Sequence, residues 1–348
     1  MRVIITGSSG QIGTNLGLRL IREGHEVLGI DNRPNTWTNE LPTLLQDLSG
    51  HYPSYPSGIG GVDYPASDVV VHLAAHAKVH QLVREPHRAL ENMVMTFNVL
   101  EYCRQTRTPI IFSSSREVYG DIHRFDTEET KADFAFTEST YSASKIAGEA
   151  LIYSYSRCYD LPYLVFRFSN VYGRYDNDIG RMVRVIPLFV QRLSRDMPIT
   201  VYGPEKVLDF TYVDDCVDGI VRGIEELVSG RTRDETINLA YGKGNSLVKM
   251  AELVAQSLGK QADITIAPSL VGEVTHYIAN IAKATQLLGY TPRVSLEDGI
   301  SRAVKWQTEW QSSSEKDGLP PVLGDENSAI DQGAGSGLAY KVAGRARR

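Results

Sequence analysis

The chain has little cysteine, no long apolar run and no excess of basic residues. Its three cysteines, Cys103, Cys158 and Cys216, lie far apart and form no C-x-x-C pair, so we expect a reducing cytoplasm rather than a disulfide scaffold. No apolar segment approaches the roughly 18 residues of a membrane span, and the start, MRVIITGSSG, is too short for a signal peptide. With 36 Lys and Arg against 42 Asp and Glu, the net charge is −6, which argues against a nucleic-acid-binding surface. We therefore expect a cytoplasmic protein without a nucleic-acid or membrane partner.

Strand-like and helix-like patterns alternate along the first half of the chain. Short runs rich in β-branched residues occupy 2–6, 26–30, 43–48, 68–75, 109–114 and 163–168, and apolar residues recur at helical spacing over 11–23, 86–106 and 141–159. This alternation predicts right-handed βαβ crossovers and a doubly wound, Rossmann-type parallel sheet. Farther along, we expect helices over 179–195, 213–229 and 248–258 and short strands over 199–202 and 264–266.

These patterns predict two domains and a tail. We expect a dinucleotide-binding domain over 1–170, to which later segments return, and a smaller C-terminal α/β substrate domain over 171–310. The last segment, 311–348, contains 13 Gly, Pro or Ser among its 38 residues and only one aromatic residue. Such a composition favours a flexible tail, although a docking arm ordered by a partner is the alternative.

The first loop has the features of a dinucleotide site. Gly7, Gly10 and Gly13 follow a strand and open a helix, so the backbone can approach a pyrophosphate at the positive end of the helix. Asp31 ends the second strand, where an acid accepts hydrogen bonds from ribose hydroxyls and repels a 2′-phosphate. NAD is therefore preferred over NADP, and the nearby Arg33 works against that preference. A tight turn would explain the glycines alone, but not the strand, helix and acid in register.

A second group of residues has the features of a catalytic site. Tyr141 and Lys145, in the segment YSASK, share one helix face at i and i+4. A Tyr hydroxyl has a pKa near ~10, and a neighbouring ammonium together with an oxidised nicotinamide ring would lower it. The phenolate could then take a proton from a substrate hydroxyl while the adjacent carbon loses hydride. Ser113, Ser114 and Ser115 end a strand at the ligand-binding edge of such sheets, where one of them could hold the same oxygen.

Five segments occur in a characteristic order: TGSSGQIG, SSSREVYG, YSASK, RFSNVYG and LDFTYVDD. Over residues 1–310 the chain thereby resembles extended short-chain dehydrogenase/reductases, and more narrowly the NAD-dependent nucleotide-sugar epimerases and dehydratases that are UDP-glucose 4-epimerase-like. The resemblance implies that Tyr141 is the acid/base, Lys145 its activator and a ribose ligand, and Ser115 the hydroxyl partner. It also implies a homodimer formed through the helices around 86–106 and 141–158. The cysteines and histidines show no metal-ligand spacing, so we expect no metal.

The resemblance extends to the binding residues. The implied NAD ligands are Gly7, Gly10, Gln11, Ile12, Gly13, Asp31, Asn32, Asp47, Leu48, Ala74, Ala75, Asn92 and Ser113, besides Tyr141 and Lys145. The implied ligands of the nucleotide-sugar substrate are Ser115, Glu117, Asn170, Arg192 and Tyr202.

The residues after Ser115 bear on the reaction. Similar 4,6-dehydratases carry an Asp-Glu pair there, the acid and base of water elimination, whereas this chain has Arg116 and Glu117. Arginine is not a useful proton donor at neutral pH, so dehydration is disfavoured. UDP-glucuronate decarboxylases keep a comparable Glu, so Glu117 leaves decarboxylation open. Epimerisation at C4 of a UDP-hexose, through a transient 4-keto sugar, requires no further acid and is our first interpretation. A non-catalytic dinucleotide-binding sensor is the rival of another class.

The chain also departs from the family pattern. Sugar epimerases usually carry two arginines that grip the diphosphate, and Leu208 and Leu270 stand at those places here. Other cations could compensate, and the candidates are Arg181, Arg184, Arg192 and Lys206.

Overall fold

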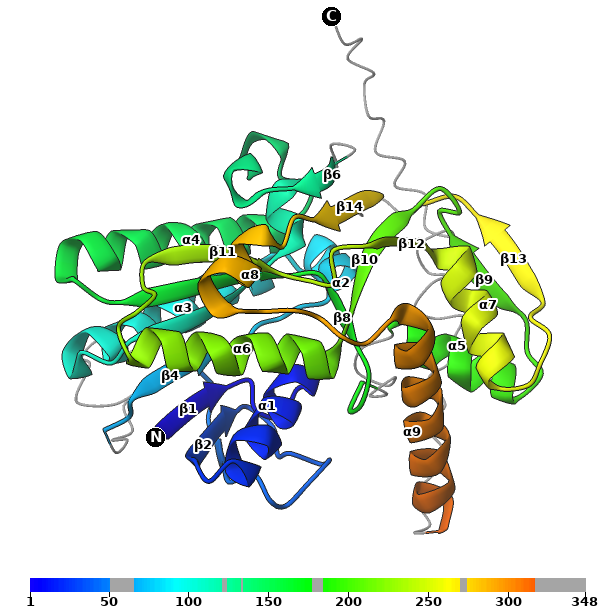
Figure 1. The fold of residues 1–348 in the computed structure, drawn as a ribbon, viewed down its shortest axis with the longest axis horizontal. Coiled ribbons are helices and arrows are strands. Elements are labelled where there is room, and N and C mark those ends of the chain that lie inside the picture. Colours follow the sequence, from blue (N-terminus) through cyan, green and yellow to red (C-terminus); the bar gives the residue numbers. More distant parts are fainter. Residues whose placement is uncertain (51–65, 121–123, 133, 177–183, 270–273, 317–348) are drawn as a thin grey trace, which may run out of the picture.

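The structure is a computed structural model that describes residues 1–50, 66–120, 124–132, 134–176, 184–269 and 274–316. The β-branched runs form one seven-stranded, fully parallel sheet in the order β11-β7-β5-β4-β1-β2-β3 (Figure 1). Its strands are β1 (Arg2–Thr6), β2 (Glu26–Asp31), β3 (Thr43–Leu45), β4 (Val69–His72), β5 (Ile110–Ser115), β7 (Tyr163–Phe168) and β11 (Glu235–Leu239). The parallel order confirms the predicted Rossmann-type fold class.

Helices cover both faces of this sheet. The longer ones are α1 (Gln11–Arg22), α3 (His87–Thr106), α4 (Thr140–Tyr159) and α6 (Val213–Val228), and the shorter ones are α2 (Val79–Arg84) and α8 (Ala282–Leu288). Consecutive residues of β1 point to opposite faces of the sheet. Val3 and Ile5 pack in the core formed with α1 and α6, and Ile4 packs in the core formed with α3 and α4. Burial on both faces explains why these strands read as continuous apolar runs.

A second group of elements lies outside the seven-stranded sheet. It contains a five-stranded sheet in the order β12-β10-β14-β6, with β8 paired to β10, and a two-stranded sheet of β13 and β9. The strands are β6 (Arg124–Thr127), β8 (Asn170–Tyr172), β9 (Ile199–Tyr202), β10 (Val207–Tyr212), β12 (Gly244–Ser246), β13 (Ile264–Ala267) and β14 (His276–Ala279). The helices are α5 (Val185–Ser194), α7 (Leu247–Ser257) and α9 (Leu296–Lys316), and short 3-10 turns are η1 (Arg116–Tyr119), η2 (Glu129–Lys131) and η3 (Phe134–Phe136). Strand β11 returns to the first sheet, while β6 joins the second.

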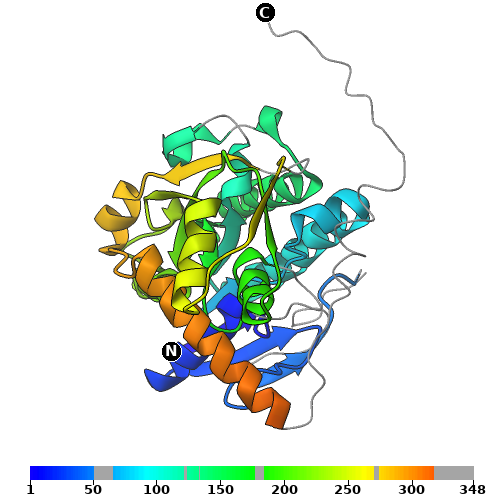
Figure 2. The same ribbon diagram turned by 90° about the vertical axis from the view of Figure 1, so that its right-hand side faces the viewer.

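All three tryptophans of the chain meet in one aromatic cluster, which joins the loop after β2 to the last helix, α9. Trp306 and Trp310 stack in α9 with ring centroids 5.6 Å apart, and Trp37, from the loop after β2, lies 5.3 Å from Trp310. Tyr175 packs on Trp306 at 5.2 Å. In Figure 2 the orange helix α9 descends to the level of the blue strands near the N-terminus, where this contact forms.

The end of α9 corrects the predicted start of the tail. The helix continues to Lys316, so residues 311–316 are helical rather than part of a flexible segment. The physical reason is the packing of Trp306 and Trp310, one helical turn apart, which anchors the last turns of α9. The rest of the predicted tail, 317–348, lies outside the described residues, as does Leu270. In the described part of the chain, no helix combines the length and apolar character needed to cross a membrane.

Candidate active site

The loop between β1 and α1 requires glycine at two positions. Gly7 has φ +73°, and a Cβ atom there would lie 2.7 Å from the Ala74 nitrogen. A Cβ atom at Gly13 would lie 2.3 Å from the Gly7 carbonyl oxygen, whereas one at Gly10 would lie 3.3 Å from it. Close backbone packing, rather than turn flexibility alone, therefore accounts for the outer two glycines.

The start of α1 fits the pyrophosphate of a dinucleotide. In the described structure its N-cap, Gly10, provides no side-chain hydrogen bond, and the first turn contains no acidic residue. The Nε2 atom of Gln11 is buried there without a hydrogen-bond partner among the described groups. Unpaired N–H groups at the positive end of a helix favour an anion, so the residues present suit the phosphates of NAD.

Asp31 is held at the carboxyl end of β2, beside this loop. Its carboxylate accepts hydrogen bonds from the backbone N–H groups of Ser9, at 3.0 Å, and Arg33, at 3.2 Å. Burial raises the pKa of Asp31, and these two N–H groups and the Arg33 charge oppose that rise. The Arg33 guanidinium folds back to donate to the Ser9 carbonyl at 2.9 Å. Asn32, the next predicted ribose ligand, is exposed.

Asn92, which the resemblance places along the cofactor channel, is hydrogen-bonded to the loop after β4. Its side-chain oxygen accepts from the His76 N–H at 2.7 Å, and its amide nitrogen donates to the His76 carbonyl and to Ser144 Oγ, both at 3.1 Å. The half-buried Ala74 and Ala75 belong to this loop. Asn92 therefore ties the loop to α4 through hydrogen bonds that the sequence did not reveal.

Asp47 and Leu48, which follow β3, lie in different environments. Leu48 is buried at 3% exposure, and its carbonyl accepts from Asn98 of α3 at 2.8 Å. Asp47 is exposed, and its carboxylate accepts from the N–H and hydroxyl of Ser49 at 2.8 and 2.7 Å. Of these two predicted adenine neighbours, Leu48 belongs to the core and Asp47 caps a turn.

The predicted catalytic residues converge at the carboxyl end of β5. Ser139 caps α4, accepting from the Ser142 N–H at 3.1 Å, and Tyr141 lies in the first helical turn. One turn later, the Lys145 ammonium donates to the Ser113 carbonyl at 2.7 Å and lies 5.8 Å from the centre of the Tyr141 ring. Ser115 hydrogen-bonds to the Tyr141 hydroxyl and thereby lowers its pKa. The structure therefore brings all four predicted residues, Ser113, Ser115, Tyr141 and Lys145, into one site.

Burial opposes the charged form of both key groups. It raises the pKa of Tyr141 to about 12, against the lowering effects of Ser115, Arg184 and Arg116. Burial also lowers the pKa of Lys145 to about 8, and the Glu149 carboxylate counteracts this shift. A Tyr141 phenolate therefore depends on positive charge close to it, which a protonated Lys145 supplies.

Glu149, one further turn along α4, anchors a buried network that sequence reasoning missed. Its carboxylate accepts two hydrogen bonds from Arg167 at 2.8 and 2.6 Å, one from Ser114 Oγ at 2.5 Å and one from the Tyr153 hydroxyl at 2.9 Å. Glu149 and Arg167 are 5% and 4% exposed. The i, i+4, i+8 spacing of Tyr141, Lys145 and Glu149 was the signal that could have revealed it.

Arg116 and Glu117 open the 3-10 turn η1 directly after Ser115. The Arg116 Nη2 atom lies 3.0 Å from Glu117 Oε1, and both side chains are largely buried, at 12% and 8% exposure. The Glu117 charge raises the pKa of Tyr141 and the Arg116 charge lowers it, so both groups lie within electrostatic reach of the reacting hydroxyl.

The predicted substrate residues of the second domain divide into two groups. Asn170 of β8 donates to the Asp209 carbonyl at 2.9 Å, which ties it to β10. Arg192 of α5 donates to the Pro198 carbonyl at 2.6 Å, within the connection to β9, and Tyr202 ends β9. Arg192 and Tyr202 therefore lie near the two-stranded sheet of β9 and β13, whereas Asn170 lies beside β10.

Arg184, one of the candidate cations, lies between the start of α1 and β8. Its guanidinium donates to Gln11 Oε1 and to the Val171 carbonyl, both at 3.0 Å, and forms an ion pair with Asp176 at 3.1 Å. It therefore bridges the start of α1 and the second domain. Leu208 is buried at 6% exposure, so its strand supplies a core side chain at that point. The Arg184 charge lowers the pKa of Tyr141, and Arg181, another candidate cation, lies outside the described residues.

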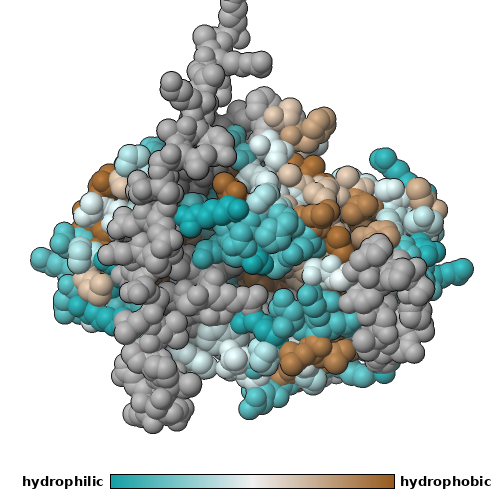
Figure 3. Space-filling view, turned by 180° about the vertical axis from the view of Figure 1, so that it is seen from behind, coloured by the Kyte–Doolittle hydropathy of each residue, from teal (hydrophilic) through white to brown (hydrophobic). Residues whose placement is uncertain are grey.

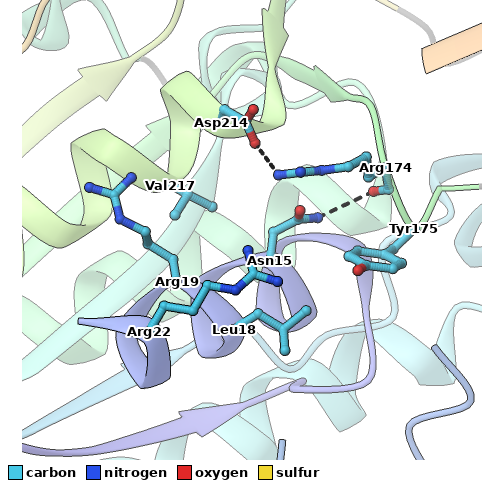
Figure 4. A pocket seen from close by; sticks show the side chains of 8 residues that line it. All are labelled: Asn15, Leu18, Arg19, Arg22, Arg174, Tyr175, Asp214 and Val217. Carbon is cyan, nitrogen blue, oxygen red and sulfur yellow. Dashed lines mark hydrogen bonds and ion pairs between the residues drawn. The ribbon is translucent and has the colours of Figure 1, made fainter. Parts of the chain in front are cut away.

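A polar pocket opens on the other end of α1 (Figure 4). It has a volume of about 230 Å³ and is lined by Asn15, Leu18, Arg19, Arg22, Arg174, Tyr175, Asp214 and Val217. Arg174 pairs with Asp214, and Arg19 pairs with Glu23 outside the pocket lining. Most of its positive charge is thus already balanced. The described residues contain no cluster of three or more His, Cys, Asp or Glu side chains arranged to hold a metal ion.

The site geometry agrees with known proteins. A family model described as NAD dependent epimerase/dehydratase family matches residues 3–240. A probable UDP-glucuronate 4-epimerase of Rhizobium meliloti is 30% identical over 335 residues, which cover 88% of this chain and 96% of that protein. A UDP-glucuronate 4-epimerase of Thermodesulfobacterium geofontis is also 30% identical, with the same coverage.

Solved structures show the same fold. The UDP-glucose 4-epimerase of Thermotoga maritima, with UDP-glucose, superposes with a TM-score of 0.79 at 27% identity, covering 89% of this chain and 100% of that one. The UDP-glucuronic acid 4-epimerase of Bacillus cereus, with UDP-glucuronic acid and NAD, gives a TM-score of 0.78 at 26% identity and the same coverage. These similarities confirm the predicted NAD cofactor, nucleotide-sugar substrate class and 4-epimerase activity. Because the family model matches more than half of the chain, we conclude that this protein belongs to the NAD dependent epimerase/dehydratase family.

Proposed function

We propose that the chain is a cytoplasmic homodimer that inverts C4 of a UDP-linked sugar, with Tyr141 as the acid/base. The observation that carries the assignment of roles is the convergence of Tyr141, Ser115 and Lys145 at one strand end, next to a glycine-rich loop suited to a dinucleotide. The named UDP-sugar 4-epimerases among its relatives support the UDP moiety.

In this mechanism the protein moves one proton and holds one oxygen. Ser115 Oγ holds the C4 hydroxyl, and Tyr141 Oη takes its proton as the hydroxyl carbon is oxidised to a ketone. NAD, when bound, supplies the hydride chemistry at C4. The positive charge of Lys145 balances the phenolate. After the keto sugar has rotated to present its opposite face to the cofactor, Tyr141 returns the proton to the same oxygen. Arg184, at the start of α1, supplies positive charge for a diphosphate.

Two features support epimerisation over its rivals within the family. Dehydration requires a proton donor after Ser115, and Arg116 cannot act as one at neutral pH. Decarboxylation through Glu117 stays the second candidate, because Glu117 influences the Tyr141 hydroxyl electrostatically.

The homodimer is supported by the surface beside α3 and α4. These two helices pack against one another along their length, and Leu90 of α3 is 63% exposed while Tyr159 of α4 is 55% exposed. Figure 3 shows brown apolar surface on the side where these helices lie. A second copy covering this side would bury it. The molar mass in solution, measured by light scattering, tests this part of the proposal.

The activity is tested by incubating the purified protein with UDP-, dTDP-, GDP- and CDP-sugars and following the products by NMR. We expect interconversion of C4 epimers of a UDP-sugar, and we expect Tyr141→Phe to lower kcat by a factor of about 100 to 10,000 while NAD binding is retained. Release of carbon dioxide would favour the decarboxylase, and a 4-keto-6-deoxy product the dehydratase. Near-normal activity of Tyr141→Phe would contradict the mechanism.

A further inference from the structure

The pocket beside α1 retains one positive charge that no carboxylate balances (Figure 4). Three of its lining residues are arginines, whereas Asp214 is the one acidic side chain among its described lining residues. Arg174 pairs with Asp214, and Arg19 pairs with Glu23. The third arginine, Arg22, makes no ion pair or hydrogen bond within the described part of the chain. The net charge of the pocket is therefore positive, which favours an anion.

Buried hydrogen bonds hold the walls of this pocket in place. Asn15 is 5% exposed, and its amide nitrogen donates to the Gln11 carbonyl at 2.9 Å and to the Arg174 carbonyl at 3.2 Å. The segment after β8 is thereby fixed against α1. The Nη2 atom of Arg174 bonds to Asp214, whereas its Nε atom has no partner among the described groups. Because 37% of this side chain is exposed, its guanidinium can also donate to a ligand at the pocket wall.

Tyr175 brings an unused hydroxyl to the same pocket. Its φ of +60° is a left-handed conformation that costs free energy for a bulky side chain. Its ring packs against Trp306 and Trp37, with ring centroids 5.2 and 5.9 Å away, and this packing holds the side chain in place. The hydroxyl makes no hydrogen bond to the described residues. In Figure 4 this hydroxyl and the Arg22 guanidinium extend toward one another, so both can reach one ligand.

The groups that line this pocket suit a phosphoryl group. Guanidinium groups donate in a fork that fits phosphate oxygens, and a tyrosine hydroxyl can donate to the same group. The pocket volume of about 230 Å³ is smaller than the roughly 300–1,000 Å³ of sites for drug-sized ligands, so a dinucleotide or a nucleotide sugar is too large for it. We propose that this pocket is a second, non-catalytic anion site, which binds inorganic phosphate or a small phosphomonoester through Arg22, Arg174 and Tyr175. This inference does not depend on the proposed function.

The expected affinity is modest. Two charge-assisted hydrogen bonds correspond to a Kd on the order of 1 mM. The exposure of Arg22 and the Asp214 carboxylate in the pocket wall prevent a tighter complex. Loss of the Arg22 charge is expected to raise the Kd about 10-fold, and loss of the Tyr175 hydroxyl about threefold.

The experiment titrates the full chain with inorganic phosphate and, separately, with ribose 5-phosphate. Saturating NAD and UDP are present throughout, so that other phosphate sites are filled, and sodium chloride at matched ionic strength is the reference. Phosphorus NMR line widths give the Kd, and thermal unfolding gives the stabilisation by bound ligand. The variants are Arg22→Met and Tyr175→Phe, which keeps the ring. The matched control is Arg231→Met, because Arg231 is 62% exposed and follows α6 at the end opposite to Asp214.

We expect at least one of the two phosphates to raise the Tm more than sodium chloride does, with a Kd that increases in Arg22→Met and Tyr175→Phe but not in Arg231→Met. The tighter of the two identifies the ligand as inorganic or organic phosphate, and either result supports the site. Stabilisation no greater than that by sodium chloride would overturn the proposal. An unchanged Kd in Arg22→Met would overturn it as well, because the anion would then bind elsewhere, and an equal loss in Arg231→Met would show an unspecific effect of charge. Since Tyr175→Phe removes only a hydroxyl, it tests the site even if Arg22→Met does not fold.

Discussion

Glu149 and Arg167 form a buried, doubly hydrogen-bonded ion pair behind the catalytic residues, with N–O distances of 2.8 and 2.6 Å. The pair connects three parts of the site. Ser114, beside the catalytic Ser115, donates to Glu149, and Arg167 donates to the Tyr119 hydroxyl of η1 at 3.1 Å. Glu149 also raises the pKa of Lys145 against the effect of burial. The ion pair therefore positions the strand end and keeps the lysine charged.

Removing one partner of this pair has two expected consequences. Glu149→Gln leaves the Arg167 guanidinium buried opposite a neutral amide, which lowers the free energy of unfolding by about 3–5 kcal/mol. It also removes the carboxylate that supports the Lys145 charge, so the pKa of Lys145 falls below about 8 and the alkaline limb of the kcat profile moves to lower pH. Urea unfolding and the pH dependence of kcat measure the two effects.

The matched control for this prediction is Glu309→Gln. Glu309 lies 3.9 Å from Lys305 on the surface of α9, with a side chain that is 66% exposed. Exposed pairs contribute little, so this variant is expected to behave as the wild type in both measurements. A loss of stability in Glu149→Gln without any movement of the alkaline limb would show that Glu149 acts only as a packing group.

The sequence predicted the parts of the molecule that depend on local patterns. Six of the seven strands of the first sheet, α3, α4 and the glycine-rich loop follow from period and spacing, because a buried parallel strand and an amphipathic helix each have a direct pattern. The seventh strand, β11, was not predicted. The meeting of Tyr141 with Ser115 also followed, since the carboxyl ends of parallel strands share one edge.

What the sequence could not show depends on contacts between distant segments. The Asn92 hydrogen bonds to His76 and the partnership of Glu149 with Arg167 are made across the fold and have no local pattern. The tail boundary was wrong by six residues because the composition of 311–316 resembles a linker, while α9 is held by the contact of Trp310 with Trp37. That Arg184 lies at the start of α1 likewise depends on a contact between distant segments.

Two glycines of the first loop are expected to respond differently to alanine. In Gly13→Ala the new Cβ meets the Gly7 carbonyl oxygen at 2.3 Å, so backbone must move and the free energy of unfolding falls by about 1–3 kcal/mol even without added NAD. In Gly10→Ala the nearest atom is 3.3 Å away and φ is −81°, so the fold is retained. Thermal unfolding in the absence of added NAD measures this difference.

Affinity for NAD provides the second readout for the same pair. Gly10 is the N-cap of α1, where a methyl group would stand between the helix end and a pyrophosphate, so Gly10→Ala is expected to weaken NAD binding without loss of stability. Unchanged NAD affinity in Gly10→Ala would place the cofactor phosphates elsewhere.

His72 is expected to make stability fall in mild acid. Burial between Thr6 and Thr96, with the Lys145 charge nearby, lowers the pKa of His72 to about 3. The unfolded chain takes up a proton near pH 6.5 that the folded protein cannot accept, so stability present above pH 6.5 is lost as the pH falls toward 3. The loss that His72 contributes at pH 5 is about 2 kcal/mol.

The comparison that isolates His72 is its replacement by a non-titrating side chain of similar polarity. His72→Gln keeps a donor and an acceptor for Thr6 and Thr96 but removes the ionisation. Urea unfolding from pH 8 to pH 5 should give a flatter dependence in this variant than in the wild type. Parallel curves would mean that His72 is not the group that titrates, whatever the absolute stability of the variant.

The tryptophan cluster predicts coupling between the last helix and the cofactor loop. Trp37 belongs to the segment that begins at Asp31, and the ring centroids of Trp37 and Trp310 lie 5.3 Å apart. Trp310→Ala removes a large part of this contact, so we expect a loss of about 1–3 kcal/mol in the free energy of unfolding and weaker binding of NAD, while kcat at saturating NAD is retained. Because all three tryptophans of the chain lie in this cluster, intrinsic fluorescence reports on it directly.

The control for Trp310→Ala lies on the same helix at an exposed position. Lys305 of α9 has a side chain that is 77% exposed, and Lys305→Ala preserves helix propensity without touching the aromatic contact. This variant should keep the wild-type fluorescence maximum and the wild-type Kd for NAD. If Trp310→Ala is destabilised but binds NAD as the wild type does, the cluster serves the packing of α9 alone. If both variants lose NAD affinity equally, the effect comes from the helix and not from the aromatic contact with Trp37.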